Sequence, residues 1–282
     1  MNKWLVGARP RTLPAAIAPV AVATALAASE ANYVSALLAL AVSLSLQVGV
    51  NYANDYSDGI KGTDDNRVGP TRLVASGLAS AKSVKQAAFV SFFIAAVIGL
   101  VLAVSTSLWL IAIGAAAILA AWTYTGSKRP YGYLGLGEIS VFLFFGLVAT
   151  MGSYYVQTEK ITWQSFMVAI PMGCLACSIL AINNLRDRAQ DELVGKRTLA
   201  VRLGDAGARK LFIGLLMLAH FAAISVPDEN TLITLALLPQ TLIIANQVRK
   251  GAAGPALIPL LGKTGQLQLW FAVALSIALA LN

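Results

Sequence analysis

The chain has 282 residues, of which 57% are apolar and 12% are charged, with a formal net charge of +8 and a mean hydropathy of +0.72. Soluble domains carry about 25% charged residues, twice this share. The composition therefore excludes a soluble enzyme, a disordered chain and a disulfide-rich scaffold, and it indicates a membrane protein.

Uncharged stretches predict the membrane-spanning helices in chain order. A helix needs about 20 mostly apolar residues to cross a bilayer. Stretches near or above this length cover residues 12–29, 31–54, 86–127, 139–158, 161–185, 211–227, 230–248 and 264–282. The third is long enough to cross twice, with a turn at Ser105-Thr106-Ser107. We therefore predict an all-α, polytopic bundle of about nine transmembrane helices, with residues 1–282 forming a single transmembrane domain.

The basic residues predict the orientation of this bundle. All but one of the 21 Lys and Arg residues fall in alternate segments between the predicted spans, and Lys160 is the exception. The positive-inside rule then places the N-terminus in the cytoplasm and the C-terminus outside. We expect a multi-pass protein of the cell (inner) membrane, surrounded by membrane lipid. The positive charge is explained by topology, so no nucleic-acid partner is predicted.

Amides and acids gather where the second predicted span ends. In order they are Asn51, Asn54, Asp55 and Asp58, followed beyond Gly59 and Gly62 by Asp64 and Asp65. Residues three or four apart on a helix are neighbours on its surface. The run therefore predicts a polar surface at the cytoplasmic end of this helix.

A matching run ends the sixth predicted span. Asn183, Asp187 and Asp191 recur every four residues, so they share one helix face. Carboxylates held together repel unless a cation neutralises them, and Mg²⁺ typically binds one or two carboxylates plus substrate phosphates. Basic residues lie nearby at Lys61, Arg67, Arg72, Lys128, Arg129, Lys196 and Arg197. Together they predict a Mg²⁺–diphosphate pocket, with plain salt bridges to the loops as the alternative.

The two motifs resemble those of the UbiA-type intramembrane prenyltransferases, which carry Asn-x-x-x-Asp-x-x-x-Asp and a later Asp-x-x-x-Asp. The run from Asp187 to Asp191, followed by Gly-Lys-Arg-Thr at 195–198, matches the second motif. Either Asn54-x-x-x-Asp58 or Asn51-x-x-x-Asp55 matches the start of the first. Gly62 stands where a third acid is expected, which leaves that role to Asp64 or Asp65.

The chain is similar to the branch of this family that prenylates 1,4-dihydroxy-2-naphthoate in menaquinone synthesis. Four segments carry this similarity: residues 8–14, 51–77, 133–146 and 183–204. The resemblance implies helices around a central cavity with an active site facing the cytoplasm. The reaction it implies joins a polyprenyl group from polyprenyl diphosphate to 1,4-dihydroxy-2-naphthoate. Diphosphate and CO₂ are lost, and demethylmenaquinone is formed.

The resemblance also suggests roles for individual residues. Mg²⁺ is the expected cofactor, and four acids are expected to take part in catalysis, namely Asp55, Asp58, Asp187 and Asp191. The wider set of candidate metal ligands is Asn51, Asn54, Asp55, Asp58, Asp64, Asn183, Asp187 and Asp191. The basic residues named above would bind the diphosphate. Candidates for the aromatic acceptor are Arg9, Arg11 and Glu138, with an interface anchor or a helix cap as the competing role. Aromatic rings that could face an allylic cation are Tyr52, Tyr56, Tyr124, Phe144 and Phe145.

Three other functions compete with this hypothesis. A prenyltransferase for 4-hydroxybenzoate or homogentisate would use the same motifs. A secondary transporter would also carry charges within the membrane, but transporters place them near the midplane, whereas these acids lie at helix ends. An inactive scaffold is disfavoured because both ligand sets are intact.

Overall fold

The computed structural model describes residues 2–63 and 69–281, and no strand occurs among them. The α-helices are α1 (Lys3–Ala8), α2 (Pro14–Ala27), α3 (Tyr33–Ile60), α4 (Ala81–Ser105), α5 (Leu110–Thr123), α6 (Gly137–Val141), α7 (Ala149–Thr158), α8 (Trp163–Leu193), α9 (Leu199–Ile224), α10 (Leu238–Arg249) and α11 (Leu257–Ala280). Short 3₁₀ helices are η1 (Pro10–Thr12), η2 (Ala28–Glu30), η3 (Tyr131–Leu134), η5 (Glu229–Leu237) and η6 (Gly254–Ala256). A π-helical segment, η4 (Phe142–Val148), joins α6 to α7. The predicted all-α class is confirmed.

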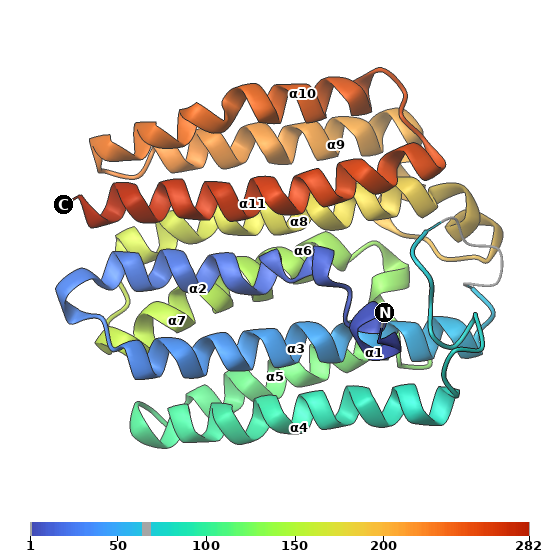
Figure 1. Ribbon diagram of the computed structural model, residues 1–282, viewed down its shortest axis with the longest axis horizontal. Coiled ribbons are helices and arrows are strands. Elements are labelled where there is room, and N and C mark those ends of the chain that lie inside the picture. Colours follow the sequence, from blue (N-terminus) through green and yellow to red (C-terminus); the bar gives the residue numbers. More distant parts are fainter. Residues whose placement is uncertain (1, 64–68, 282) are drawn as a thin grey trace.

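The long helices run roughly parallel or antiparallel to one another in one bundle (Figure 1). Helices α9, α10 and α11 form one side, and α3, α4 and α5 form the other. The strongest pairings join α3 to α4, α8 to α9, and α11 to α2. The C-terminal ends of α3 and α8 lie at the same end of the bundle as α1. Two motifs far apart in sequence are thus brought to one end of the molecule.

Multiple membrane crossings are confirmed, but the predicted count of nine is not. Among the described residues, 6 helical segments are long and apolar enough to cross a membrane: Tyr33–Ile60, Ala81–Ser105, Gly137–Thr158, Trp163–Leu193, Leu199–Ile224 and Glu229–Arg249. A seventh would be the N-terminal pair Lys3–Thr12 and Pro14–Glu30, which is bent by 53°. Helix α5 is apolar but shorter. The turn expected at residues 105–107 is confirmed, because α4 ends at Ser105 and α5 begins at Leu110.

Local signals set where the two motif-bearing helices begin. The side chain of Asn32 accepts hydrogen bonds from the backbone N–H groups of Val34 and Ser35 at the start of α3. A capping box of Thr162 and Ser165 opens α8. Both helices then continue through their acidic motifs, so the predicted helical spacing of the amides and acids is present in the structure.

The two largest of the four apolar clusters among the described residues hold these helices in place. The larger core joins α8 to α9 and α11 through Met172, Phe212 and Phe271. The smaller core packs α3 and the 70–80 loop against α4 through Leu73 and Phe92. Helix α8 is the central element, since 78% of its most apolar 18-residue stretch is buried inside the protein. The site therefore lies between two firmly packed helix ends.

Candidate active site

A cavity of about 720 Å³ lies between the two motif-bearing helices. Its polar end is lined by Asn51, Asn54, Asp58, Asn183, Asp187 and Lys196. Its apolar part is lined by Ala39, Val42, Leu102, Ile113, Val148 and Val156. Along α3 the lining runs from Ala39 to Asp58, about 28 Å at 1.5 Å per residue. The cavity can therefore hold a ligand with a charged head and a long apolar tail.

Asp58 and Asn54 present the first motif to this cavity. One carboxylate oxygen of Asp58, Oδ1, accepts a hydrogen bond of 2.7 Å from the hydroxyl of Tyr133. Asn54 Oδ1 accepts one of 2.8 Å from Thr125 Oγ1. Asp58 is buried. Both side chains are thus held in one orientation by groups from the segment that follows α5.

Asp55 has a different position from Asp58. It is 0% exposed, and its two oxygens accept hydrogen bonds from the backbone N–H groups of Leu73 at 2.9 Å and Val74 at 3.0 Å. It does not line the cavity. Asp55 therefore fastens the 70–80 loop to α3, and unlike Asp58 it does not face the cavity where a shared metal was predicted.

Asn51 lines the cavity and also fixes the N-terminal segment. Its Nδ2 donates to the backbone oxygen of Ala8 at 2.9 Å and to Thr12 Oγ1 at 3.0 Å. Arg9 donates in turn to the backbone oxygen of Asn51 at 3.1 Å. These bonds fix the N-terminal segment whose Arg9 and Arg11 line the cavity.

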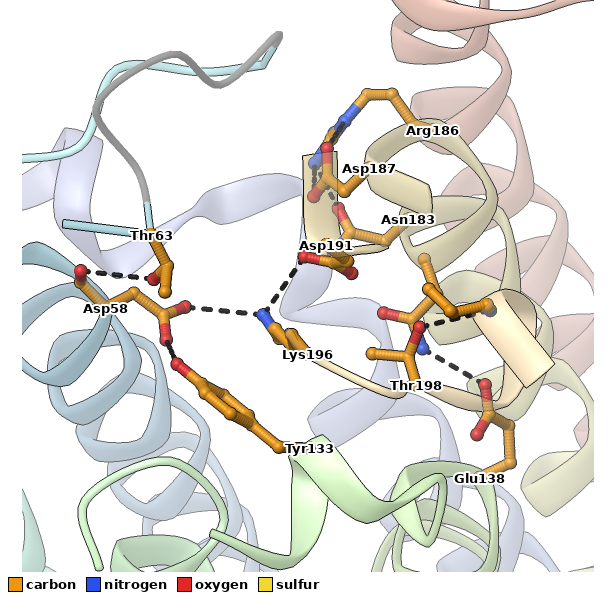
Figure 2. Close-up of polar contacts among 12 residues, drawn as sticks. Asp58, Thr63, Tyr133, Glu138, Asn183, Arg186, Asp187, Asp191, Lys196 and Thr198 are labelled. Carbon is orange, nitrogen blue, oxygen red and sulfur yellow. Dashed lines mark hydrogen bonds and ion pairs between the residues drawn. The ribbon is translucent and has the colours of Figure 1, made fainter. Parts of the chain in front are cut away.

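The second motif is held by an arginine within it. Arg186 donates from Nε and Nη2 to the two oxygens of Asp187, both at 2.7 Å, and from Nη2 to Asn183 Oδ1 at 2.8 Å (Figure 2). All three line the cavity. A planar guanidinium suits such two-pronged contact with a carboxylate. Arg186 was not among the predicted site residues, although its position inside the motif was the available signal.

Lys196 joins the two motifs. Its Nζ lies 3.7 Å from Asp58 Oδ2 on α3 and 3.6 Å from Asp191 Oδ1 on α8. Figure 2 shows it between these carboxylates. A positive charge is thus placed where acids from the two helices meet. Lys196 thus has one carboxylate of each motif, Asp58 and Asp191, within 4 Å of its Nζ.

Tyr133 is a site residue that received no role in the sequence analysis. The Nζ atoms of Lys61 and Lys196 lie 5.0 and 5.1 Å from the centre of its ring. Burial, and then the nearby carboxylate of Asp58, raise the pKa of Tyr133, so its hydroxyl stays a donor to Asp58. Burial lowers the pKa of Lys61, whose Nζ donates to the backbone oxygen of Thr125 at 2.7 Å.

The predicted residues fall into three groups. Those that line the cavity are Arg9, Arg11, Asn51, Asn54, Asp58, Arg72, Asn183, Asp187 and Lys196. Those outside its lining are Asp55, Lys61, Lys128, Arg129, Glu138, Asp191 and Arg197, of which Lys61, Lys128, Arg129 and Arg197 are exposed. Asp64, Asp65 and Arg67 lie outside the described residues. Of the aromatic candidates, Tyr124, Phe144 and Phe145 line the cavity, whereas Tyr52 and Tyr56 do not.

The acids fit a metal that arrives with a phosphate ligand. Within residues 2–63 and 69–281, no three His, Cys, Asp or Glu side chains form a group that could hold a metal ion by themselves. Mg²⁺, however, usually takes one or two carboxylates and completes its shell with water and substrate phosphates. Asp58 and Asp187, with amide oxygens beside them, are hard oxygen donors of this kind. The donor set suits a metal–diphosphate complex better than a bare ion.

Known proteins share both the sequence pattern and the fold. The sequence profile described as the UbiA prenyltransferase family matches residues 16–251. The chain is 50% identical to a 1,4-dihydroxy-2-naphthoate octaprenyltransferase of Mycobacterium tuberculosis, over 99% of this chain and 97% of that protein. It is 41% identical to the protein of the same name from Escherichia coli, over 76% and 72%. A UbiA homolog from Archaeoglobus fulgidus bound to GPP and Mg²⁺ shares the fold, with a TM-score of 0.72 at 15% identity and full coverage of both chains.

Proposed function

The chain belongs to the UbiA prenyltransferase family, and we propose on that basis that it is a 1,4-dihydroxy-2-naphthoate polyprenyltransferase of menaquinone synthesis. This enzyme transfers a polyprenyl group from polyprenyl diphosphate to the naphthoate ring. The allylic C–O bond breaks and its electron pair leaves with diphosphate. A C–C bond forms to the ring, and CO₂ departs and leaves its bonding pair on the ring. The product is the reduced form of demethylmenaquinone.

The shape and lining of the cavity support this proposal. One end is polar and lined by both acidic motifs, and the apolar part follows α3 from Val50 back to Ala39, about 16 Å at 1.5 Å per residue. A polyprenyl diphosphate has this same division into a charged head and an apolar tail. The extensive identity to naphthoate prenyltransferases supports the choice of acceptor.

We assign metal binding to the acids that face the cavity or Lys196. Asp58 from α3, with Asp187 and Asp191 from α8, would hold Mg²⁺, aided by the amide oxygens of Asn54 and Asn183. When bound, the metal would neutralise charge on the departing diphosphate. Structures of a UbiA homolog from Archaeoglobus fulgidus bound to Mg²⁺ or to Cd²⁺ support a divalent ion. Asp64 stays a further candidate ligand.

Basic residues at the same end would bind the diphosphate oxygens. Arg72 and Lys196 line the cavity and can donate charge-assisted hydrogen bonds to phosphate. Arg186 can do the same on α8, where its guanidinium already lies among the metal-binding candidates. Lys128, Arg129 and Arg197 are exposed outside the lining, so we give them no direct role.

Two further sets of residues would bind the naphthoate ring and stabilise the allylic cation. Arg9 and Arg11 line the cavity and are placed to bind the naphthoate carboxylate. The rings of Tyr124, Phe144 and Phe145 also line it, and aromatic faces stabilise cations. The surrounding bundle excludes water from an allylic cation, which would otherwise be lost to hydrolysis.

The test is a reaction of the purified protein with 1,4-dihydroxy-2-naphthoate and an allylic diphosphate, with Mg²⁺ or with EDTA. Mass spectrometry should detect the prenylated naphthoquinol only when Mg²⁺ is present. Parallel reactions contain 4-hydroxybenzoate or homogentisate. Product from one of these acids but not from the naphthoate would contradict the proposed acceptor. Absence of product with every acceptor would contradict prenyl transfer itself.

A further inference from the structure

A buried amide–carboxylate pair lies beside the cavity and has no part in the roles assigned above. Asn184 on α8 donates from Nδ2 to Glu138 Oε1 on α6 at 3.1 Å. Asn184 is 6% exposed and Glu138 is 7% exposed. The thiol of Cys177 donates to the backbone oxygen of Glu138 at 3.1 Å, which fixes α6 against α8. Asn184 lines the cavity, whereas Glu138 lies behind it.

The carboxylate determines which way the Asn184 amide faces. The amide nitrogen points towards Glu138, because Glu138 Oε1 accepts its hydrogen bond. The oxygen, Oδ1, is then the outward acceptor of a side chain that forms part of the cavity wall. No hydrogen bond to this oxygen occurs within the described part of the chain. An amide oxygen in a cavity wall can accept a hydrogen bond, so Oδ1 is suited to a donor on a ligand.

The surroundings of the pair are aromatic. Tyr124 lies next to α6, since a Cβ atom built on Gly137 would be 3.0 Å from the Tyr124 hydroxyl and 3.2 Å from Leu180 Cδ2. The ring of Tyr131 packs edge-on against Tyr124 with centroids 5.4 Å apart, and both rings line the cavity. A flat aromatic ligand would find ring surfaces and one hydrogen-bond acceptor here.

We propose that Asn184 Oδ1 accepts a hydrogen bond from a hydroxyl of the aromatic acceptor, and that Glu138 is the positioning residue that keeps this oxygen facing the cavity. The inference rests on the proposed function for the identity of the acceptor. In 1,4-dihydroxy-2-naphthoate the 1-hydroxyl can bond internally to the adjacent carboxylate. The 4-hydroxyl is therefore the donor that remains for Asn184. Asn184 immediately follows Asn183 of the metal-binding face, so this bond would orient the ring relative to the diphosphate.

The experiment compares two ligands that differ by the hydroxyl in question. Full-length protein in detergent, with Mg²⁺ and inorganic pyrophosphate, is titrated with 4-hydroxy-2-naphthoate and with 2-naphthoate. The wild type should bind the hydroxylated ligand about tenfold more tightly, which corresponds to 1.4 kcal/mol. Asn184→Ala should bind the two ligands with about equal affinity. Glu138→Ala should keep part of the preference for the hydroxylated ligand. Asn246→Ala on α10, away from the cavity, is the matched control and should keep the preference.

Removing one partner of a buried pair can disturb folding, because the other is left unsatisfied. The double variant Asn184→Ala/Glu138→Ala removes both and should show the same lost preference. Retained binding of Mg²⁺ and pyrophosphate shows that each variant has an intact metal site. A preference that survives in Asn184→Ala and in the double variant, or is absent from the wild type, overturns the inference. Failure of the proposed function is a separate result, seen when the wild type does not prenylate the naphthoate.

Discussion

Asp55 and Asp58 lie three residues apart on α3, yet their carboxylates have different partners. Asp58 faces the cavity with Tyr133 and Lys196 beside it, whereas Asp55 binds the backbone of Leu73 and Val74. Asp55 is a structural tie, because it is 0% exposed, does not line the cavity and bonds to the backbone of the 70–80 loop. The helical spacing that places the two acids near each other does not give them one function.

Asparagine at each position should separate these functions. Asp55→Asn keeps one acceptor and turns an NH₂ group towards a backbone donor, so it should destabilise the protein by about 1.5–3 kcal/mol and lower the midpoint of thermal unfolding in detergent. Asp58→Asn should change that midpoint little and weaken Mg²⁺-dependent pyrophosphate binding at least about tenfold. Calorimetry measures both quantities. Equal effects of the two substitutions on stability and on binding would contradict the assignment.

Lys196 occupies the space between acids of both motifs, so it should compete with a metal ion. We predict that Lys196→Met binds Mn²⁺ at least about tenfold more tightly than the wild type when no pyrophosphate is present. The same variant should lose affinity for pyrophosphate, because a phosphate donor is removed. Electron paramagnetic resonance of free Mn²⁺ measures the binding. Lys128→Met is the control, since Lys128 is exposed and lies outside the cavity lining; the same gain in that variant would refute the competition.

The sequence could identify the two motifs but not all of their partners. Helical spacing predicts that the amide and acid of each motif share one helix face. The structure places all four residues at one cavity, namely Asn54, Asp58, Asn183 and Asp187. Tyr133 reaches Asp58 across 75 positions of sequence, and Leu73 lies 18 positions from Asp55. Such contacts depend on how the loops close over the bundle. No local periodicity encodes that closure.

At the scale of the helices, a close glycine contact sets the position of the segment that carries Phe144 and Phe145. A Cβ atom on Gly146 of η4 would lie 2.6 Å from the Cα atom of Gly173 on α8. Small residues allow such backbone approach between helices in a membrane. The π-helical turn of η4 was not predicted from the sequence, since an uncharged stretch shows length and polarity but not this change of helical pitch.

Alanine at this contact should push η4 away from α8. We expect Gly146→Ala to cost about 1–3 kcal/mol, as overpacking usually does, and to lower the thermal midpoint in detergent. Gly152→Ala on α7 is the control, because a Cβ atom there meets nothing within 4 Å. Indistinguishable thermal midpoints for the two alanine variants would show that the η4–α8 contact is adaptable.

For the whole molecule, composition predicted a membrane bundle, and the described chain has that form. The number of spans is harder to predict from the sequence than the fold class, because one helix is short and another contains polar residues. Helix α5 has only 14 residues, fewer than the about 20 that cross a bilayer unaided. Helix α11 has 24 residues but includes Lys263, Gln266 and Gln268. Short or polar-interrupted helices can be covered by neighbours in a bundle, so stretches of sequence alone do not fix the count.

The orientation of the whole bundle can be tested at its two ends. Charge placement predicts that the loop with Lys128 faces the cytoplasm with the active site, and that Lys160 faces outside. Lys160 has a side-chain exposure of 56% and Lys128 is exposed, so cysteines there can react with an impermeant maleimide. The native Cys174 and Cys177 are buried and should give little background. In intact cells Lys160→Cys should be labelled, and Lys128→Cys should be labelled only after lysis. The reverse pattern would place the diphosphate site outside, away from cytoplasmic supplies of substrate, and would contradict the proposed topology.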